Sequence, residues 1–140
     1  AESCTGGKLG GYLTSFQGAS AVFKGGIIAY SNYTKQKILG VNQELIEEFG
    51  AVSNEVVKAM AKGAKEKIGT DWAIAISGIA GPTGNTEAKP IGYVEFGIAG
   101  PKLIKSISIN FGSHKGRVEI QDLSVIKALD ELRLIILKET

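Results

Sequence analysis

The chain has 140 residues, 44% of them hydrophobic and 21% charged, with a formal net charge of +2. This length suits a single domain, and the balanced charge argues against binding of nucleic acid through a basic surface. One Cys and one His exclude a disulfide framework and a Cys/His metal cluster. The lone Cys is typical of a reducing cytoplasm, and no apolar run reaches membrane-spanning length. We therefore expect a cytoplasmic protein with no membrane partner.

The first part of the chain predicts short elements separated by glycine-rich turns. Residues 5–16 fit a helix with Thr5 as its N-cap, and the apolar run 26–30 fits a buried strand. Two short helices are expected next, over 35–39 and 42–49, the second with Asn42 as its N-cap. The glycines in the first helix make packing, rather than propensity, its main source of stability.

The second part contains the clearest periodic patterns. Ser53 is expected to cap a helix over 54–68, in which an apolar residue recurs every four positions. This stripe consists of Val56, Met60, Ala64 and Ile68. The last helix is expected over 117–138, with Leu123, Ile126, Leu129 and Leu132 among its apolar positions.

Three further strands complete the prediction, over 72–76, 92–99 and 103–109, the last two joined as a hairpin. The element order predicts one domain, 1–140, of the α/β class. We expect a three-layer α/β/α sandwich with a mixed, mainly parallel sheet. Ligands of such folds bind beyond the carboxyl ends of the strands. Tyr30-Ser31-Asn32 and Ser77-Gly78 follow strands directly, so we expect them to meet there.

Several residues are candidate nucleophiles by position: Ser3, Cys4, Thr5, Ser20, Ser31 and Ser77. The only His is His114, in a distant loop, so a Ser-His-Asp triad is disfavoured. A serine with Lys or Tyr as base fits better, because Lys35 lies five residues after Tyr30. The alternative is that the serines cap helices, that Lys35 is solvated and that Cys4 is a small buried hydrophobe.

Two glycine-rich turns are candidate anion sites. Thr5-Gly6-Gly7 opens a helix, and Ser77-Gly78-Ile79-Ala80-Gly81 follows a strand, so both offer backbone amides. Lys115 and Arg117, at the start of the last helix, add possible charge-assisted contacts. A surface ion pair is the alternative role for Arg117.

The motifs together resemble the C-terminal domain of the competence/damage-inducible CinA proteins, over nearly the whole chain. They are Ala1-Glu2-Ser3-Cys4-Thr5-Gly6-Gly7, Gly18-Ala19-Ser20, Gly25-Gly26 leading to Tyr30-Ser31-Asn32, Gly40-Val41, Gly50-Ala51-Val52-Ser53, Ser77-Gly78-Ile79-Ala80-Gly81-Pro82 and Lys89-Pro90-Ile91-Gly92. The resemblance implies an amidohydrolase that converts nicotinamide mononucleotide to nicotinic acid mononucleotide and ammonia, in pyridine-nucleotide salvage. It also implies a homodimer or higher homo-oligomer, and no metal or other cofactor.

The resemblance assigns roles to individual residues. Ser20 is the leading nucleophile, Ser3 its alternative or partner, and Tyr30 and Lys35 the base and proton-relay groups. Arg117 is the phosphate contact. The remaining substrate contacts are Thr5, Gly6, Gly18, Ser77, Gly78 and Ala80.

The chain departs from the family pattern in two places. The Gly-Asp-Arg expected before the last helix is here Lys115-Gly116-Arg117, and a second Arg expected four residues later is Gln121. A helix and strand, and a larger domain, usually precede the Ala-Glu-Ser motif in the family and are absent from this sequence. The change at the phosphate end motivates a second hypothesis, a nucleotide-binding or regulatory module without catalysis. A structural oligomerisation domain is the third.

Overall fold

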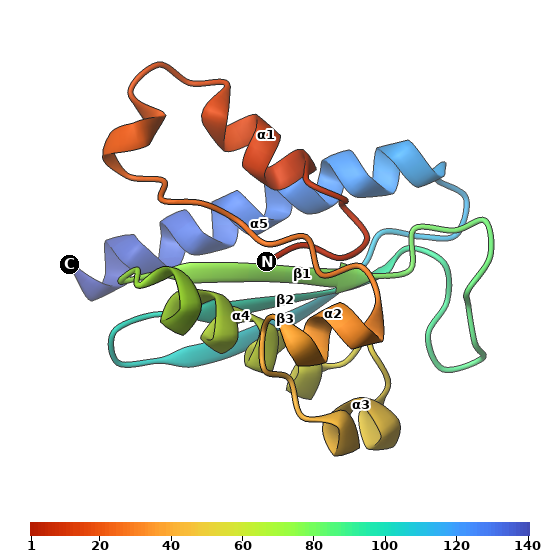
Figure 1. Cartoon of the computed structure of the whole chain (residues 1–140). Coiled ribbons are helices and arrows are strands. Elements are labelled where there is room, and N and C mark those ends of the chain that lie inside the picture. Colours follow the sequence, from red (N-terminus) through yellow and green to blue (C-terminus); the bar gives the residue numbers. More distant parts are fainter.

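A computed structural model describes all 140 residues and shows a central sheet with helices on both faces (Figure 1). The strands of the sheet, in spatial order, are β1 (Ala73–Gly78), β2 (Tyr93–Ala99) and β3 (Ile104–Asn110). Both neighbouring pairs are antiparallel, with Phe96 of β2 opposite Ile76 on one side and Ile107 on the other. The predicted hairpin and the strand before it are therefore confirmed.

The prediction of a mainly parallel sheet is wrong. Parallel pairing is limited to two isolated bridges, in which Glu2 lies between Ile28 and Ile76. No helix connects β1 to β2 or β2 to β3, and parallel neighbours need such a crossover. The expected strand over 26–30 is accordingly reduced to the single bridge at Ile28.

The helices divide between the two faces of the sheet. They are α1 (Lys8–Thr14), the 3-10 helix η1 (Ala19–Ala21), α2 (Asn32–Lys37), α3 (Gln43–Phe49), α4 (Asn54–Ile68) and α5 (Arg117–Glu139). One core cluster joins the sheet to α1 and α5, and the other joins it to α3 and α4. Helix α4 lies so close to β2 that a Cβ on Gly97 would be 2.2 Å from the Val57 carbonyl oxygen.

Two of the three predicted helix caps are confirmed. Ser53 Oγ accepts a hydrogen bond from the Val56 amide at the start of α4, and Asn42 caps α3 in the same way. Thr5 is not a cap, because its hydroxyl donates to the Glu2 carboxylate (2.6 Å). Helix α1 consequently starts later, at Lys8, with Gly7 as N-cap, and is shorter than predicted.

Helix α5 has nearly the predicted length, and its predicted apolar face is confirmed in part, because Leu129 and Leu132 pack against the core cluster. Ile126, expected among the apolar positions, is 60% exposed, and the buried positions include Ile120, Val125 and Ala128. A helix of 23 residues that covers the sheet along one side only leaves some apolar positions in solvent.

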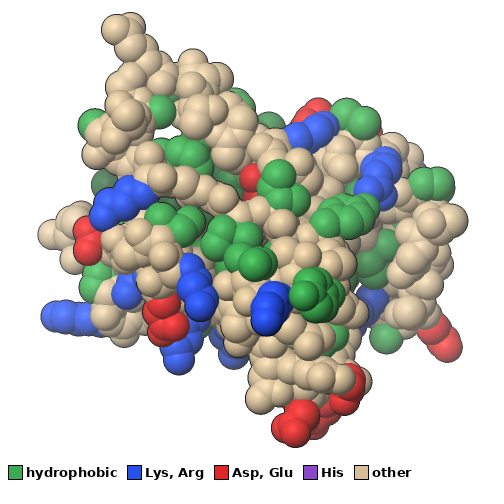
Figure 2. Space-filling model, in the orientation of Figure 1, with side chains coloured by type: hydrophobic (Ala, Val, Ile, Leu, Met, Phe, Trp, Pro, Cys, Tyr) green, Lys and Arg blue, Asp and Glu red, His purple; other side chains and the backbone are tan.

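Charged side chains are distributed over the surface without a continuous basic stripe on the face shown in Figure 2. Acidic side chains gather at the lower end of that view, over α3, where Glu44, Glu47 and Glu48 are exposed. None of the helices is long and apolar enough to cross a membrane.

Candidate active site

Ser3 lies where the first residues of the chain turn away from the sheet. Its amide donates to the Ile76 carbonyl of β1 (2.9 Å), and its carbonyl accepts from the Gly6 amide (3.0 Å). Gly6 has φ 58°, a left-handed conformation that glycine adopts without steric cost. The turn from Ser3 to Gly6, called here the Ser3 turn, therefore presents the Ser3 hydroxyl at the edge of the short parallel pairing. Ser3 is 8% exposed.

Helix α2 brings Lys35 to Ser3. Ser31 caps this helix by accepting from the Thr34 amide (3.1 Å), so the helix begins at Asn32 rather than at residue 35 as predicted. An earlier start places Lys35 on the inner side of the helix instead of at its first position. The side chain is fully buried, and the expectation of a solvated Lys35 is wrong.

The Lys35 amine contacts three oxygen atoms. Its Nζ lies 3.0 Å from Ser3 Oγ, 3.0 Å from the Ala29 carbonyl oxygen and 3.1 Å from the Tyr30 carbonyl oxygen. No carboxylate lies within 4.0 Å of it. Burial lowers the pKa of Lys35, because an ammonium loses hydration there, and the nearby Cys4 opposes this only in part.

These contacts suit both protonation states of Lys35. The two carbonyl oxygens can only accept, so each takes one N–H. The third partner, the Ser3 hydroxyl, can accept from an ammonium or donate to the lone pair of a neutral amine. Loss of the lysine proton therefore reverses this one hydrogen bond and leaves the amine positioned as a base for Ser3.

Arg117 joins two of the predicted loops at the start of α5. Its Nη1 donates to the Gly81 carbonyl (2.8 Å) and its Nη2 to the Tyr30 hydroxyl (3.0 Å). Arg117 thus links the Tyr30 side chain to Gly81, three residues beyond the Ser77-Gly78 pair that was expected to meet the Tyr30 segment. Lys115 contacts only its neighbour His114 (3.1 Å), and no serine hydrogen-bonds to that histidine.

Ser77 occupies the strand next to Ser3. The parallel bridge between Glu2 and Ile76 is followed by Ser3 on one segment and by Ser77 on the other, and the Ser3 amide donates to the Ile76 carbonyl. The Ser77 hydroxyl donates to the Ala51 carbonyl (2.8 Å) and is buried. Of the other predicted contacts after β1, Gly78 is half-buried at the end of the strand and Ala80 is buried.

The Cys4 thiol is not a nucleophile at neutral pH. Burial raises its pKa to about 12, although nearby cations oppose the shift. A thiol with this pKa stays protonated at pH 7, and only the thiolate attacks. The interpretation of Cys4 as a buried hydrophobe is confirmed by its place in the core cluster with Leu9 and Ile76.

Ser20 lies away from this site. It is exposed in η1, and the next residue, Ala21, lines a cavity together with Leu132 of α5. Leu132 is fifteen residues beyond Arg117, about 22 Å along a helix. The structure therefore brings Ser3, Tyr30, Lys35 and Arg117 together through hydrogen bonds and leaves Ser20 and Gly18 without a hydrogen bond to any of them.

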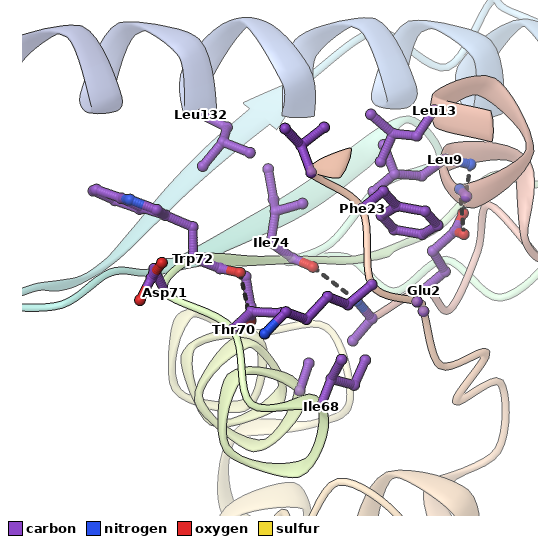
Figure 3. A pocket seen from close by; sticks show the side chains of 18 of the residues that line it. Glu2, Leu9, Leu13, Phe23, Ile68, Thr70, Asp71, Trp72, Ile74 and Leu132 are labelled. Carbon is purple, nitrogen blue, oxygen red and sulfur yellow. Dashed lines mark hydrogen bonds between the residues drawn. The ribbon is translucent and has the colours of Figure 1, made fainter. Parts of the chain in front are cut away.

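One apolar cavity does not include the Ser3–Lys35 contact, although Ala1 and Glu2, which directly precede Ser3, line it. It has a volume of about 570 Å³ and is lined mainly by apolar side chains, among them Phe23, Trp72 and Leu132 (Figure 3). Neither Ser3, Lys35, Tyr30 nor Arg117 lines it.

The contacts of two residues that shape the site, Glu2 and Gln121, were not predicted from the sequence. Glu2 accepts hydrogen bonds from the Leu9 amide (2.8 Å) and the Gly10 amide (3.0 Å), which anchors α1 to the Ser3 turn. Gln121 Nε2 donates to the Cys4 carbonyl (2.9 Å) from α5. A carboxylate shortly before a helix was a usable signal for Glu2, whereas the contact of Gln121 spans 117 positions and has no local signal.

Comparison with known proteins identifies the family. The family model described as CinA C-terminal domain matches residues 1–136. A CinA-like protein of Prochlorococcus marinus is 57% identical over 140 residues, covering the whole of this chain and 33% of that protein. A CinA-like protein of Parasynechococcus marenigrum is 54% identical with the same coverage. The chain thus spans about a third of the length of these curated relatives.

Solved structures agree in fold. The competence/damage inducible protein CihA of Agrobacterium tumefaciens matches with a TM-score of 0.92 at 38% identity, over 95% of this chain and 81% of that one. A competence-damaged protein (CinA) superfamily protein of Escherichia coli matches with a TM-score of 0.91 at 33% identity, over 96% and 77%.

Proposed function

This chain belongs to the CinA C-terminal domain family, and we propose that it is an amidohydrolase that converts nicotinamide mononucleotide to nicotinic acid mononucleotide and ammonia. The observation that carries this proposal is the 3.0 Å contact between the buried Lys35 amine and the Ser3 hydroxyl. A carboxamide is a poor electrophile, so its hydrolysis needs an activated hydroxyl and a base beside it. This pair supplies both.

The reaction follows from the two protonation states of Lys35. The neutral amine takes the proton of the Ser3 hydroxyl while Oγ attacks the carboxamide carbon. The resulting ammonium returns the proton to the leaving nitrogen, so ammonia departs and an ester on Ser3 remains. Water, deprotonated by the same amine, then releases the carboxylate and restores Ser3.

Arg117 is the proposed contact for the substrate phosphate. Its guanidinium carries five N–H donors, and the structure occupies only two of its nitrogen atoms, with Gly81 and Tyr30. A planar donor held from two sides suits a phosphate, whose oxygens accept paired hydrogen bonds. Tyr30 therefore serves both ends of the site, with its carbonyl on Lys35 and its hydroxyl on Arg117.

Ser20 is the second candidate for the nucleophile, on the strength of the family resemblance. In that case Ser3 would pass the proton from Ser20 to Lys35, and the segment with η1 would have to move toward α2. A cytoplasmic place in pyridine-nucleotide salvage, catalysis without a metal, and assembly as a homodimer or larger oligomer are parts of the same proposal.

The test is release of ammonia from nicotinamide mononucleotide by the purified protein, with the organic product identified by mass. We expect the acid product, loss of turnover in Ser3→Ala, and turnover within about tenfold of normal in Ser20→Ala. The reverse pattern would assign the nucleophile to Ser20. A folded protein that yields no acid would contradict the proposed activity.

A nucleotide-binding module without catalysis remains the second candidate function. It is favoured by the departures from the family pattern around the proposed phosphate contact. Lys115-Gly116 precedes Arg117 in place of Gly-Asp, and Gln121, in place of a second Arg, contacts the Ser3 turn. It predicts thermal stabilisation by nicotinamide mononucleotide with no product formed. Formation of acid product by the unmodified protein, lost in Ser3→Ala, would exclude it.

A further inference from the structure

Helix α5 holds the Ser3 turn in place through one side chain. Gln121 Nε2 donates to the Cys4 carbonyl over 2.9 Å, and Gln121 itself is half-buried. It lies one helical turn after Arg117, so the helix that carries the proposed phosphate contact also contacts the turn that carries Ser3.

Two consecutive peptide units of this turn are fixed by their carbonyl oxygens. The Ser3 carbonyl accepts from the Gly6 amide, and the Cys4 carbonyl accepts from Gln121. In a planar trans peptide the N–H points opposite to the C=O. The directions of the Cys4 and Thr5 amides are therefore determined by these two hydrogen bonds.

Neither of these amides has an oxygen acceptor in the protein, and the Cys4 amide contacts only the sulfur of its own side chain. The Cys4 and Thr5 N–H groups donate to no backbone or side-chain oxygen, although Cys4 is 5% and Thr5 1% exposed. Buried backbone N–H groups are almost always paired. Two neighbouring donors of buried residues without an oxygen acceptor, next to a hydroxyl bonded to a buried lysine, indicate a place for an anion.

The geometry points to the Cys4 and Thr5 amides as the donors that stabilise the oxyanion, and to Gln121 as the residue that positions them. This inference rests on the proposed amide hydrolysis. When Ser3 Oγ attacks, negative charge develops on the carboxamide oxygen, and the amide of the residue after the nucleophile is a common donor to it in serine hydrolases. Gln121 touches neither substrate nor Ser3 and acts by fixing the Cys4–Thr5 peptide.

The first measurement is kcat and KM for nicotinamide mononucleotide in Gln121→Glu and Gln121→Met. Both remove the N–H donor, and we expect kcat to fall about tenfold or more with KM within about twofold, because an oxyanion donor acts in the transition state. The pH dependence should be unchanged, since Lys35 is not altered. Gln121→Lys, which keeps an N–H donor of similar reach, should recover most of the loss. Gln43→Glu makes the same change on exposed α3 and should behave as the unmodified protein.

A second measurement separates this inference from the choice of substrate. A fluorophosphonate probe forms a phosphonyl ester on an activated serine oxygen and releases fluoride, and its P=O oxygen needs the same donors. Mass spectrometry should locate the label on Ser3, and the rate of labelling should fall about tenfold in both donor-free Gln121 variants.

The outcomes distinguish the two proposals. Slower labelling in the Gln121 variants, with no turnover of nicotinamide mononucleotide by the unmodified protein, would support the oxyanion site and contradict the substrate. Equal labelling rates in all Gln121 variants would overturn the inference, as would a folded protein in which Ser3 does not react. A shifted pH profile in Gln121→Met would also overturn it, because that result would place the effect on Lys35.

Discussion

Glu2 and Lys35 are two buried ionisable side chains near Ser3 whose hydrogen-bond partners differ in kind. The Glu2 carboxylate accepts three hydrogen bonds, from the Thr5 hydroxyl and the Leu9 and Gly10 amides. Figure 3 shows the Glu2 side chain directed at the first turn of α1. Lys35 instead contacts two carbonyls and the Ser3 hydroxyl, with no anion beside it.

These different surroundings suit Glu2 to stabilising the fold and Lys35 to acting as a base. Donors at a helix start stabilise a carboxylate through hydrogen bonds and the helix dipole, so the contacts of Glu2 fix the start of α1. Carbonyl oxygens compensate an ammonium only in part, so burial lowers the pKa of Lys35. A lysine that loses its proton more easily is a better base, at a cost in stability while it is charged.

The largest effect is expected from Lys35→Met, which keeps the length of the side chain and removes the base. Turnover of nicotinamide mononucleotide should fall about 10²–10⁴-fold, the usual contribution of a general base. Lys37→Met alters an exposed lysine of the same helix and should leave turnover unchanged. Normal turnover in Lys35→Met would show that Lys35, like Glu2, has no catalytic role.

A smaller and more selective effect is expected from Arg117→Gln. Loss of a charged hydrogen-bond donor to phosphate should raise KM for the mononucleotide about 10–100-fold. Hydrolysis of nicotinamide riboside, which lacks the phosphate, should be unaffected. Arg133→Gln changes the other arginine, which pairs with Asp130 at the surface, and serves as control. An equal loss with both substrates would show that Arg117 does not contact phosphate.

Glu2→Gln should affect stability more than chemistry. An amide retains one acceptor oxygen but loses the charge, so we expect a loss of about 1–3 kcal/mol in the free energy of unfolding. Denaturant unfolding measures this, with the exposed Glu48→Gln as control. An unchanged stability together with a turnover loss like that of Lys35→Met would make Glu2 a catalytic group instead.

The smallest effect is the contribution of Lys35 to the pH dependence of stability. Its pKa in the folded protein is lowered from the ordinary value of about 10.4, so between these two values the unfolded chain binds more protons. The free energy of unfolding should therefore rise with pH through this window, and Lys35→Met should lack this part of the rise. Parallel pH curves for the two proteins would show that burial does not perturb Lys35.

The sequence predicted the helices and strands of the second half well because their signals are local. Ser53 caps α4 as expected, and the hairpin of β2 and β3 was visible in its alternating pattern and turn. The relative direction of neighbouring strands has no such local signal. Whether β1 and β2 run parallel depends on how the 79–92 loop returns, and its Gly and Pro residues carry no direction.

The site was predictable where its residues are close in sequence and not where they are distant. Tyr30 and Lys35 were identified by their short spacing, and Arg117 by its place at a helix start and by the family resemblance. That Ser3 rather than Ser20 contacts Lys35 follows from the two parallel bridges of Glu2, which no spacing reveals. The contact of Gln121 with Cys4 likewise joins residues from opposite ends of the chain.

The most direct test of the account is the titration of Lys35 itself, followed by NMR of ¹³C-labelled lysine and assigned with Lys35→Met. We predict a pKa below the ordinary value of about 10.4, matching the acid limb of the pH profile of kcat/KM for nicotinamide mononucleotide. A Lys35 that titrates at the ordinary value, or an acid limb that persists in Lys35→Met, would contradict the claim that this buried amine is the base for Ser3.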